Sequence, residues 1–133
     1  MAFLIESSIW VDFTRAKSSR ALKERILPWI LDPAASIGEP VAFEVLRHAT
    51  PVERPRIEAQ FATFPLLETP PMIWRDATRL GQRCRDAGVT AGSLDLLISA
   101  LALHHAAELV TFDLDYLEIA KATGLRVRLL KRD

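Results

Sequence analysis

The 133-residue chain is half hydrophobic and 26% charged, with 17 basic side chains balancing 17 acidic ones. This composition predicts a single globular domain over residues 1–133 and argues against intrinsic disorder. The balanced charge provides no overall positive field of the kind that by itself would indicate a nucleic-acid partner.

The first half of the chain alternates short apolar runs with helical patterns. It predicts a strand, two helices, a weak strand, a helix and a short extended piece, at residues 2–6, 9–15, 18–32, 35–40, 41–49 and 65–69. Ser7 or Ser8 is the expected N-cap of the first helix and Ser18 or Ser19 that of the second, in which Pro28 predicts a kink. The proline-rich stretch before the extended piece predicts a broken helix and turns.

The second half continues the alternation with a helix, a helix, a strand, a helix and a strand, at residues 73–87, 94–107, 108–112, 114–123 and 125–130. Gly88 and Gly124 are the expected helix stops, and Ser93 the expected cap of the second helix. Strands separated by helices predict a parallel sheet covered on both faces. The fold class is therefore α/β, in three α/β/α layers.

Acidic side chains stand where such a sheet places its ligand sites. Glu6 ends the first strand, Asp113 follows the fourth, and Asp115 lies two residues further on. Asp95 begins the most apolar helix, and Glu44 lies about one turn into the helix after the weak strand. Because strand ends and helix starts meet at the carboxyl edge of a parallel sheet, these carboxylates are directed at one region.

Their mutual repulsion is costly unless protons or a cation offset it. Carboxylate ligands without accompanying cysteines suit a hard cation, Mg²⁺ or Mn²⁺. Such an ion polarises a phosphoryl oxygen and activates water for attack on a phosphodiester. The cluster therefore predicts metal-dependent hydrolysis of nucleic acid.

Each acid has a plainer explanation when taken singly. Asp95 complements a helix dipole, Asp113 caps the helix after it, and Glu44 is a solvated helix residue. The convergence of several acids on one edge favours the metal site. Asp12 is left out of the ligand set, because it is expected to face solvent or to pair with Arg15 three residues on.

Other polar features give weaker indications. His104 and His105 point about 100° apart on a helix, so they predict a helix end and not a shared zinc ion. The basic stretch over residues 15–25 is either a solvated face or a surface that steers a phosphate backbone. The three tryptophans are expected in the core or at an interface.

Cys84 is the only cysteine, which excludes an internal disulfide and fits a reducing cytoplasm. No apolar run reaches the roughly 18 residues of a membrane span, and the start of the chain lacks a signal-peptide pattern. We therefore expect a cytoplasmic protein without a membrane partner.

Four segments in chain order resemble the motif blocks of PIN-domain ribonucleases, in particular the VapC-like toxins of bacterial toxin–antitoxin operons. The segments are FLIESSIWVDFTR, EPVAFEVLRHA, LDLLISALAL and LVTFDLDYLE. The resemblance implies a PIN-like parallel-sheet fold, Mg²⁺- or Mn²⁺-dependent endonucleolytic cleavage of RNA, and inhibition by a cognate antitoxin. It also implies a homodimer, which fits apolar helices and tryptophan-bearing faces that exceed what a small monomer hides.

By position, Glu44, Asp95 and Asp113 match the acids of the family. The resemblance implies supporting roles for Ser7, beside the first acid, for Thr111, and for Asp115 as a further acid. Glu6 occupies the position of the first acid, so the expected metal ligands are Glu6, Asp95 and Asp113.

Glu6 is also the departure from the family, which usually has Asp there. The longer side chain leaves open a catalytically weakened PIN domain that binds RNA or its antitoxin without efficient cleavage. A third hypothesis, a signalling receiver domain, lacks the expected phosphoacceptor Asp after a middle strand and the Lys after a late one.

Overall fold

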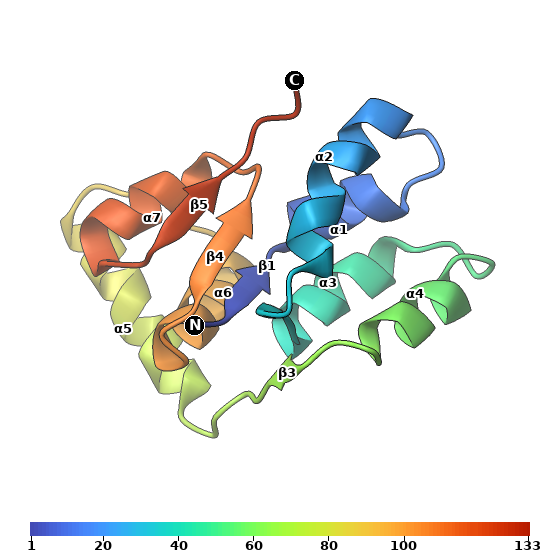
Figure 1. Cartoon of the computed structure of the whole chain (residues 1–133). Coiled ribbons are helices and arrows are strands. Elements are labelled where there is room, and N and C mark those ends of the chain that lie inside the picture. The colour runs from blue at the N-terminus through green and yellow to red at the C-terminus, as the bar shows by residue number, and fades with distance from the viewer.

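Strand β1 lies at the centre of a five-stranded, all-parallel sheet with the order β3-β2-β1-β4-β5. The computed structural model describes all of residues 1–133 (Figure 1). The strands are β1 (Phe3–Ile5), β2 (Ala35–Gly38), β3 (Leu66–Leu67), β4 (Glu108–Thr111) and β5 (Val127–Leu129). The predicted α/β class and the parallel sheet are thus confirmed, although every strand is shorter than expected.

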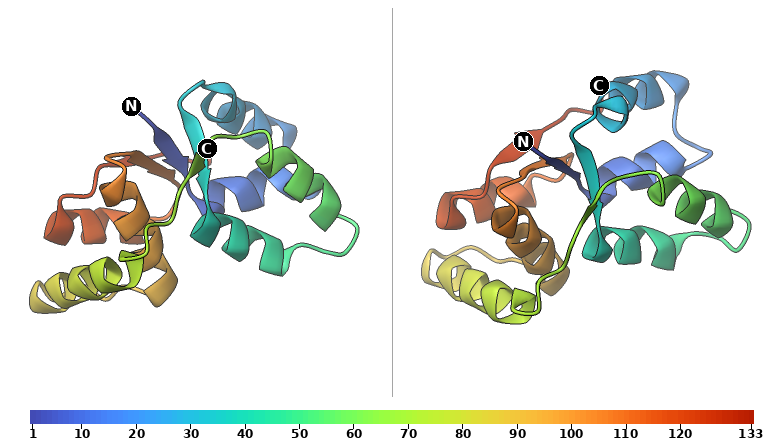
Figure 2. Two further views of the ribbon diagram at one scale, coloured as in Figure 1. Left: turned by 90° about the horizontal axis from the view of Figure 1, so that it is seen from below. Right: turned by 60° about the horizontal axis from the view of Figure 1, so that its bottom comes forward.

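Seven helices form the two outer layers. They are α1 (Ser7–Thr14), α2 (Arg20–Leu31), α3 (Glu39–His48), α4 (Arg54–Phe61), α5 (Ile73–Asp86), α6 (Ser93–His104) and α7 (Asp115–Thr123). In both views of Figure 2, α1–α4 lie to one side of the strands and α5–α7 to the other, which confirms the three-layer arrangement. No helix in the structure has the length and apolar character needed to cross a membrane.

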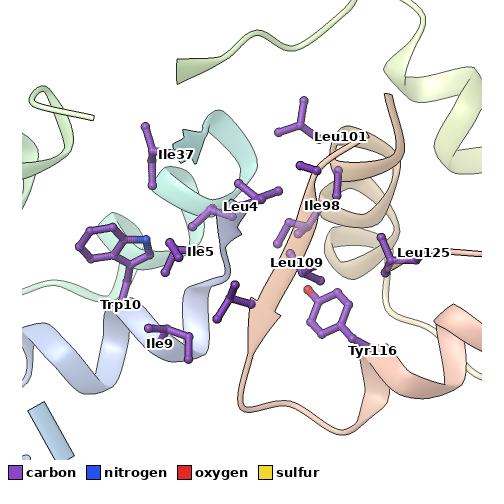
Figure 3. Packing of buried hydrophobic residues seen from close by; sticks show 14 of the residues in the cluster. Leu4, Ile5, Ile9, Trp10, Ile37, Ile98, Leu101, Leu109, Tyr116 and Leu125 are labelled. Carbon is purple, nitrogen blue, oxygen red and sulfur yellow. The ribbon is translucent and has the colours of Figure 1, made fainter. Parts of the chain in front are cut away.

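The core is one cluster of 27 buried hydrophobic residues (Figure 3). Leu4 and Ile5 of β1 and Leu109 of β4 are fully buried, as expected for central strands covered on both faces. Gly38 ends β2 against α6, where an added Cβ would lie 2.3 Å from Leu101 Cδ2. A larger residue there would have to displace the buried Leu101 side chain, so glycine allows α6 to pack closely against the end of β2.

Helix ends agree with the sequence at some positions and differ at others. The Ser19 side chain accepts a hydrogen bond from the Leu22 N–H, so this predicted cap is confirmed. Gly88 and Gly124 both have positive φ, as expected of the residues that end α5 and α7. Helix α3 begins at Glu39 and not at residue 41, because Pro40 in its first turn fits a helix start.

Two predicted serine caps are wrong. Glu6 is the N-cap residue of α1 and Gly92 that of α6, and neither helix start has a side-chain capping bond. The Ser8 hydroxyl is instead engaged with the Glu6 side chain. Helix α6 also ends earlier than expected, at His104, because Ala106 adopts a left-handed conformation with φ 52°.

The order of the strands positions the functional site. From β1 the chain proceeds to β2 and β3 on one side, and it then returns to β4 on the other side of β1. Neighbouring strands β1 and β4 therefore form the topological switch point of the sheet. In open α/β sheets, ligands bind at the carboxyl ends of the strands beside this point. Glu6 follows β1 and Asp113 lies just after β4, so both stand at that position.

Candidate active site

A cavity of about 330 Å³ opens at the carboxyl edge of the sheet beside β1 and β4. Of the 11 residues that line it, only one is hydrophobic. The four acids that the sequence directs at one region, Glu6, Glu44, Asp95 and Asp113, all line this cavity. They come from the end of β1, the middle of α3, the first turn of α6 and the loop after β4.

Three carboxylates lie close enough to share one cation. Asp95, Asp113 and Asp115 each offer an oxygen, and these oxygens lie within 4.8 Å of one another. Opposite ligands of an octahedral Mg²⁺ are roughly 4.2 Å apart, so the three side chains fit a hard divalent cation after small adjustments. Glu6, an expected ligand, is not part of this close group, whereas Asp115, expected in a supporting role, belongs to it.

Two hydroxyls hold Glu6. The Ser8 and Thr111 hydroxyls each donate to Glu6 Oε1 at 2.5 Å. Each hydroxyl has a single proton, so the 3.3 Å approach of Ser8 Oγ to Thr111 Oγ1 adds no further bond. Neither hydroxyl donates to the other carboxylate oxygen, Oε2. Glu6 is therefore held by both hydroxyls through one oxygen, and its side chain lines the cavity.

The same hydroxyls are themselves oriented by the backbone. Ser8 Oγ accepts a hydrogen bond from the Phe112 N–H at 3.0 Å, and Thr111 Oγ1 accepts one from the Asp113 N–H at 2.9 Å. These bonds connect the start of α1 to the end of β4. The position of Glu6 is thus coupled to the loop that carries Asp113.

Ser8, and not Ser7, makes the contact with the first acid. The Ser7 Oγ is buried and has no hydrogen-bond partner, although Ser7 lines the cavity. The resemblance alone singled out Ser7, while the sequence suggested only a cap for Ser8. A serine two residues after a strand-end carboxylate is a local signal that would have identified Ser8, because its hydroxyl can reach back to that side chain.

Burial and neighbouring charge both disfavour ionisation of Glu6. The side chain is 4% exposed, and burial is the main cause that raises its pKa. The bonds from Ser8 and Thr111 lower the pKa in opposition, and the charge of Glu44 raises it again. A cation in the cavity would offset these costs.

Asp95 receives a hydrogen bond from a buried tyrosine that the sequence analysis missed. The Tyr116 hydroxyl donates to Asp95 Oδ1 at 3.1 Å from a fully buried position. Burial, followed by the charges of Glu6 and Asp95, raises the Tyr116 pKa, so the hydroxyl stays a donor. Burial is also the main cause that raises the Asp95 pKa, ahead of the opposing bond from Tyr116 and the repulsion from Asp113. A buried tyrosine usually needs a hydrogen-bond partner, which was the available signal.

Asp113 lies both beside the start of α7 and in the wall of the cavity. Its Oδ1 accepts a hydrogen bond from the Asp115 N–H at 2.9 Å, so it stabilises the start of α7. It also lines the cavity and belongs to the close group of carboxylates. This bond brings Asp115, the first residue of α7, to the same edge.

The expectation for Asp12 is wrong. Asp12 is 8% exposed, lines the cavity and accepts a hydrogen bond from Arg132 Nε at 2.7 Å, without an ion pair to Arg15. Arg15 and His48 also line the cavity and were not singled out as site residues. The helical spacing from Ser8 to Asp12 places both on one face of α1, but the partner lies 120 residues away in sequence.

His104 and His105 are found at the end of α6, as predicted, and neither belongs to the metal-compatible group. Trp10 is fully buried in the core, Trp29 packs at its edge against Phe3, and Trp74 is 69% exposed. The acidic cavity is therefore lined by none of the tryptophans.

The chain is similar to known proteins in both sequence and structure. The PIN domain family model matches residues 3–122. VapC ribonuclease Mb1587 of Mycobacterium bovis is 35% identical over 128 residues, which cover 92% of this chain and 95% of the relative.

Two solved structures share the fold at lower identity. VapBC2 of Rickettsia felis, bound to a DNA fragment from its promoter, has a TM-score of 0.78 at 15% identity and covers 98% of this chain and 100% of its own. A toxin–antitoxin complex from Klebsiella pneumoniae has a TM-score of 0.71 at 22% identity, and the match covers 100% of this chain and 98% of that chain.

The raised pKa of Glu6 predicts how stability depends on pH when no metal is bound. The folded protein holds this proton more tightly than the unfolded chain, so the contribution of Glu6 is fully present below the ordinary Glu pKa. It is lost as the pH rises through the folded-state pKa. In EDTA at pH 7.5, Glu6→Gln is therefore expected to raise the melting temperature by a few degrees, and this gain should shrink at pH 4.

Thermal unfolding followed by circular dichroism at both pH values checks this. Glu118→Gln, on the exposed face of α7, is the matched control and should show no such pH-dependent gain. A melting temperature of Glu6→Gln at or below that of the parent at pH 7.5 would contradict the burial argument.

Proposed function

The chain belongs to the PIN domain family, in its VapC group, and from this premise we propose that it is a metal-dependent endoribonuclease and the toxin of a toxin–antitoxin pair. Residues 1–133 would act as one domain, which the single core cluster supports. A ribonuclease of this kind would act in the cytoplasm, where its substrate RNA is found.

One observation carries the proposal. Carboxylates from four distant parts of the chain line one polar cavity at the switch point of the sheet, and oxygens of Asp95, Asp113 and Asp115 lie within 4.8 Å of one another. Such a concentration of partly buried negative charge is unfavourable without a cation. Oxygen-only donors suit Mg²⁺ or Mn²⁺.

The residues divide into ligands and groups that orient them. Asp95 and Asp113 would hold the ion, with Asp115 on the exposed side and Glu6 on the buried side through Oε2, the oxygen to which neither hydroxyl donates. Glu44 of α3, which lines the same cavity, would be a further catalytic acid. When bound, the ion would lower the pKa of a coordinated water and stabilise charge that develops on the phosphate.

The supporting hydrogen bonds restrict the ligands to one arrangement. Thr111 and Ser8 fix the Glu6 carboxylate, and the Tyr116 hydroxyl fixes that of Asp95. Outer partners of this type orient ligands and tune the affinity for the ion. They would also keep the repelling carboxylates in place before the ion binds.

An antitoxin protein is the proposed partner and inhibitor, supported by the structural likeness to a toxin–antitoxin complex. We further propose a homodimer. An apolar groove of about 350 Å³ lies between α3, α5 and α6, and beside it Phe43 and Trp74 are 60% and 69% exposed. Protruding rings beside a groove suit a two-fold pair, in which each copy inserts its rings into the other.

A second candidate function is a weakened PIN domain that binds RNA or antitoxin without efficient cleavage. The observation that favours it is the absence of Glu6 from the close group of carboxylates. A receiver domain is disfavoured by topology, because the strand order of that flavodoxin-like fold begins 2-1-3 and this sheet begins β3-β2-β1.

The first test of the function is metal-dependent cleavage of RNA. Purified protein freed of antitoxin is expected to cleave RNA with Mg²⁺ or Mn²⁺ and to stop in EDTA. Asp95→Asn or Asp113→Asn should each lower the rate at least about a hundredfold, since even outer partners of a metal can matter that much. The circular dichroism spectrum should stay nearly unchanged, because the amide oxygen can still accept the bonds from Tyr116 and from the Asp115 N–H. Asp86→Asn, at the exposed end of α5, is the control, and cleavage that persists in EDTA would exclude the metal mechanism.

The second test concerns Glu6 and separates the two candidate functions. Asp is shorter by one methylene, and a misplacement of about 1 Å can cost on the order of a hundredfold in rate. Glu6→Asp is therefore expected to raise the Mg²⁺-dependent rate by about tenfold, or to lower the Mg²⁺ concentration at half-maximal rate. Glu6→Gln should remove activity.

Initial cleavage rates across a Mg²⁺ titration measure both effects. If Glu6→Asp is no better than the parent and Glu6→Gln is equally active, Glu6 is not a ligand. A parent that cleaves poorly beside an active Glu6→Asp variant would support the weakened domain.

The third test concerns assembly. Light scattering of the parent at micromolar concentration, without antitoxin, is expected to give twice the 14.9 kDa chain mass. Trp74→Glu should give the monomer mass, because it places a charge in the apolar groove. Leu31→Glu, equally exposed at the end of α2 on the other side of the sheet, should remain dimeric. A parent that is monomeric would refute the dimer.

A further inference from the structure

Arg132 lines the cavity but comes from a part of the chain outside the four segments that resemble the motif blocks of the family. The Leu130 N–H donates to the Thr111 carbonyl at 2.8 Å, so the alignment with β4 continues past the end of β5. In Figure 1 the chain then leaves β5 and runs toward the side of α1 and α2. This path brings Arg132 to the wall of the cavity, within hydrogen-bond distance of Asp12 on α1.

Two contacts hold Arg132 in place. Its Nε donates to Asp12 Oδ2 at 2.7 Å, and its Cζ lies 4.6 Å from the centroid of the Phe112 ring. The Asp12 side chain is only 11% exposed, so its charge depends on this partner. An arginine restrained in this way loses less freedom when it binds a further ligand.

Both terminal nitrogens of Arg132 remain available. Only Nε has a protein acceptor, and the side chain is 56% exposed. The planar fork of a guanidinium matches the oxygens of a phosphate group. A cavity-lining arginine with unused Nη1 and Nη2 is therefore equipped to bind an anion.

The charge pattern of the cavity indicates why such a group is needed. Five carboxylates line it, and they repel the phosphates of an incoming RNA strand. Three basic side chains line the same cavity, namely Arg15, His48 and Arg132. Arg15 and His48 are exposed and have no ion pair, whereas Arg132 is held by a carboxylate and a ring. Arg132 is thus the pre-positioned one of the three.

We propose that Arg132 binds a non-bridging phosphate oxygen of the RNA backbone beside the scissile phosphate, and that Asp12 and Phe112 position it for this role. The inference rests on the proposed ribonuclease function and adds a substrate-binding residue to it. Arg132 acts on substrate affinity, while the acids act on the reaction itself.

Binding is measured apart from cleavage, in an Asp113→Asn background with Mg²⁺, using fluorescence anisotropy of a short fluorescein-labelled single-stranded RNA. Arg132→Gln is expected to raise the Kd about tenfold and to lower the slope of log K against log salt by about one. Arg128→Gln is the matched control. Arg128 also pairs with a carboxylate, that of Glu108, and lies over a ring, that of Trp29, but it is not among the residues that line the cavity, so the Kd should change less than about twofold.

Loss of Arg132 leaves the buried Asp12 charge without a partner, so Arg132→Gln alone can destabilise the fold. The double variant Asp12→Asn with Arg132→Gln removes both charges and keeps the net charge of the parent. It is expected to melt near the parent temperature and still to bind RNA about tenfold more weakly. Because the net charge is unchanged, weaker RNA binding by this double variant would reflect the loss of Arg132 from the cavity and not a change in the overall electrostatic field.

Cleavage kinetics with the native acids give the second readout. Arg132→Gln should raise KM about tenfold and leave kcat within about threefold. If parent and variant bind and cleave RNA alike, or if Arg128→Gln weakens binding equally, the role of Arg132 is refuted while the ribonuclease function stands. If the parent does not cleave RNA but binds it in an Arg132-dependent way, the phosphate site stands and the proposed function fails.

Discussion

The burial of the Glu6 carboxylate at the end of the central strand is the constraint on which the rest of the site depends. A charge in this position is tolerated because Ser8 and Thr111 donate to one of its oxygens, and because backbone N–H groups of Phe112 and Asp113 orient those hydroxyls in turn. The network joins β1, α1 and β4 at the switch point. It therefore fixes Glu6 and the loop that carries Asp113 relative to each other.

Charge around this network is balanced in two different ways. Asp12 has a protein partner, since Arg132 reaches it from beyond β5. Asp95 has a hydrogen bond from Tyr116 but no cationic partner, and burial, followed by neighbouring carboxylates, raises its pKa. Under the proposed function, a cation would balance the acids that have no cationic partner in the protein. Arg132 would then remain as a group for the substrate.

Much of the fold was predictable because its signals are local. The apolar runs identified β1, β4 and β5, whereas β2 was predicted as a weak strand mainly from its position and β3 as a short extended piece. Ser19, Gly88 and Gly124 marked helix ends through their own backbone or side-chain chemistry. The expectations that failed involve competition between local and distant partners. Ser8 was a reasonable cap for α1, but its hydroxyl donates to Glu6 and accepts from Phe112, which is 104 residues away. Ala106 ended α6 early in a left-handed conformation that its residue type does not signal.

By itself, the sequence determined that carboxylates would gather at one edge of a parallel sheet, because strand ends and helix starts share that edge whatever the details of packing. Tertiary structure alone decided which of these carboxylates lie close together and which side chains and backbone N–H groups bind them. Asp115 joins Asp95 and Asp113 because the Asp115 N–H bonds to the Asp113 side chain, and Asp12 belongs to the cavity wall because Arg132 crosses the sheet edge to meet it. These outcomes depend on distances between segments far apart in the chain, and such distances are fixed only when the strands pair and the helices pack.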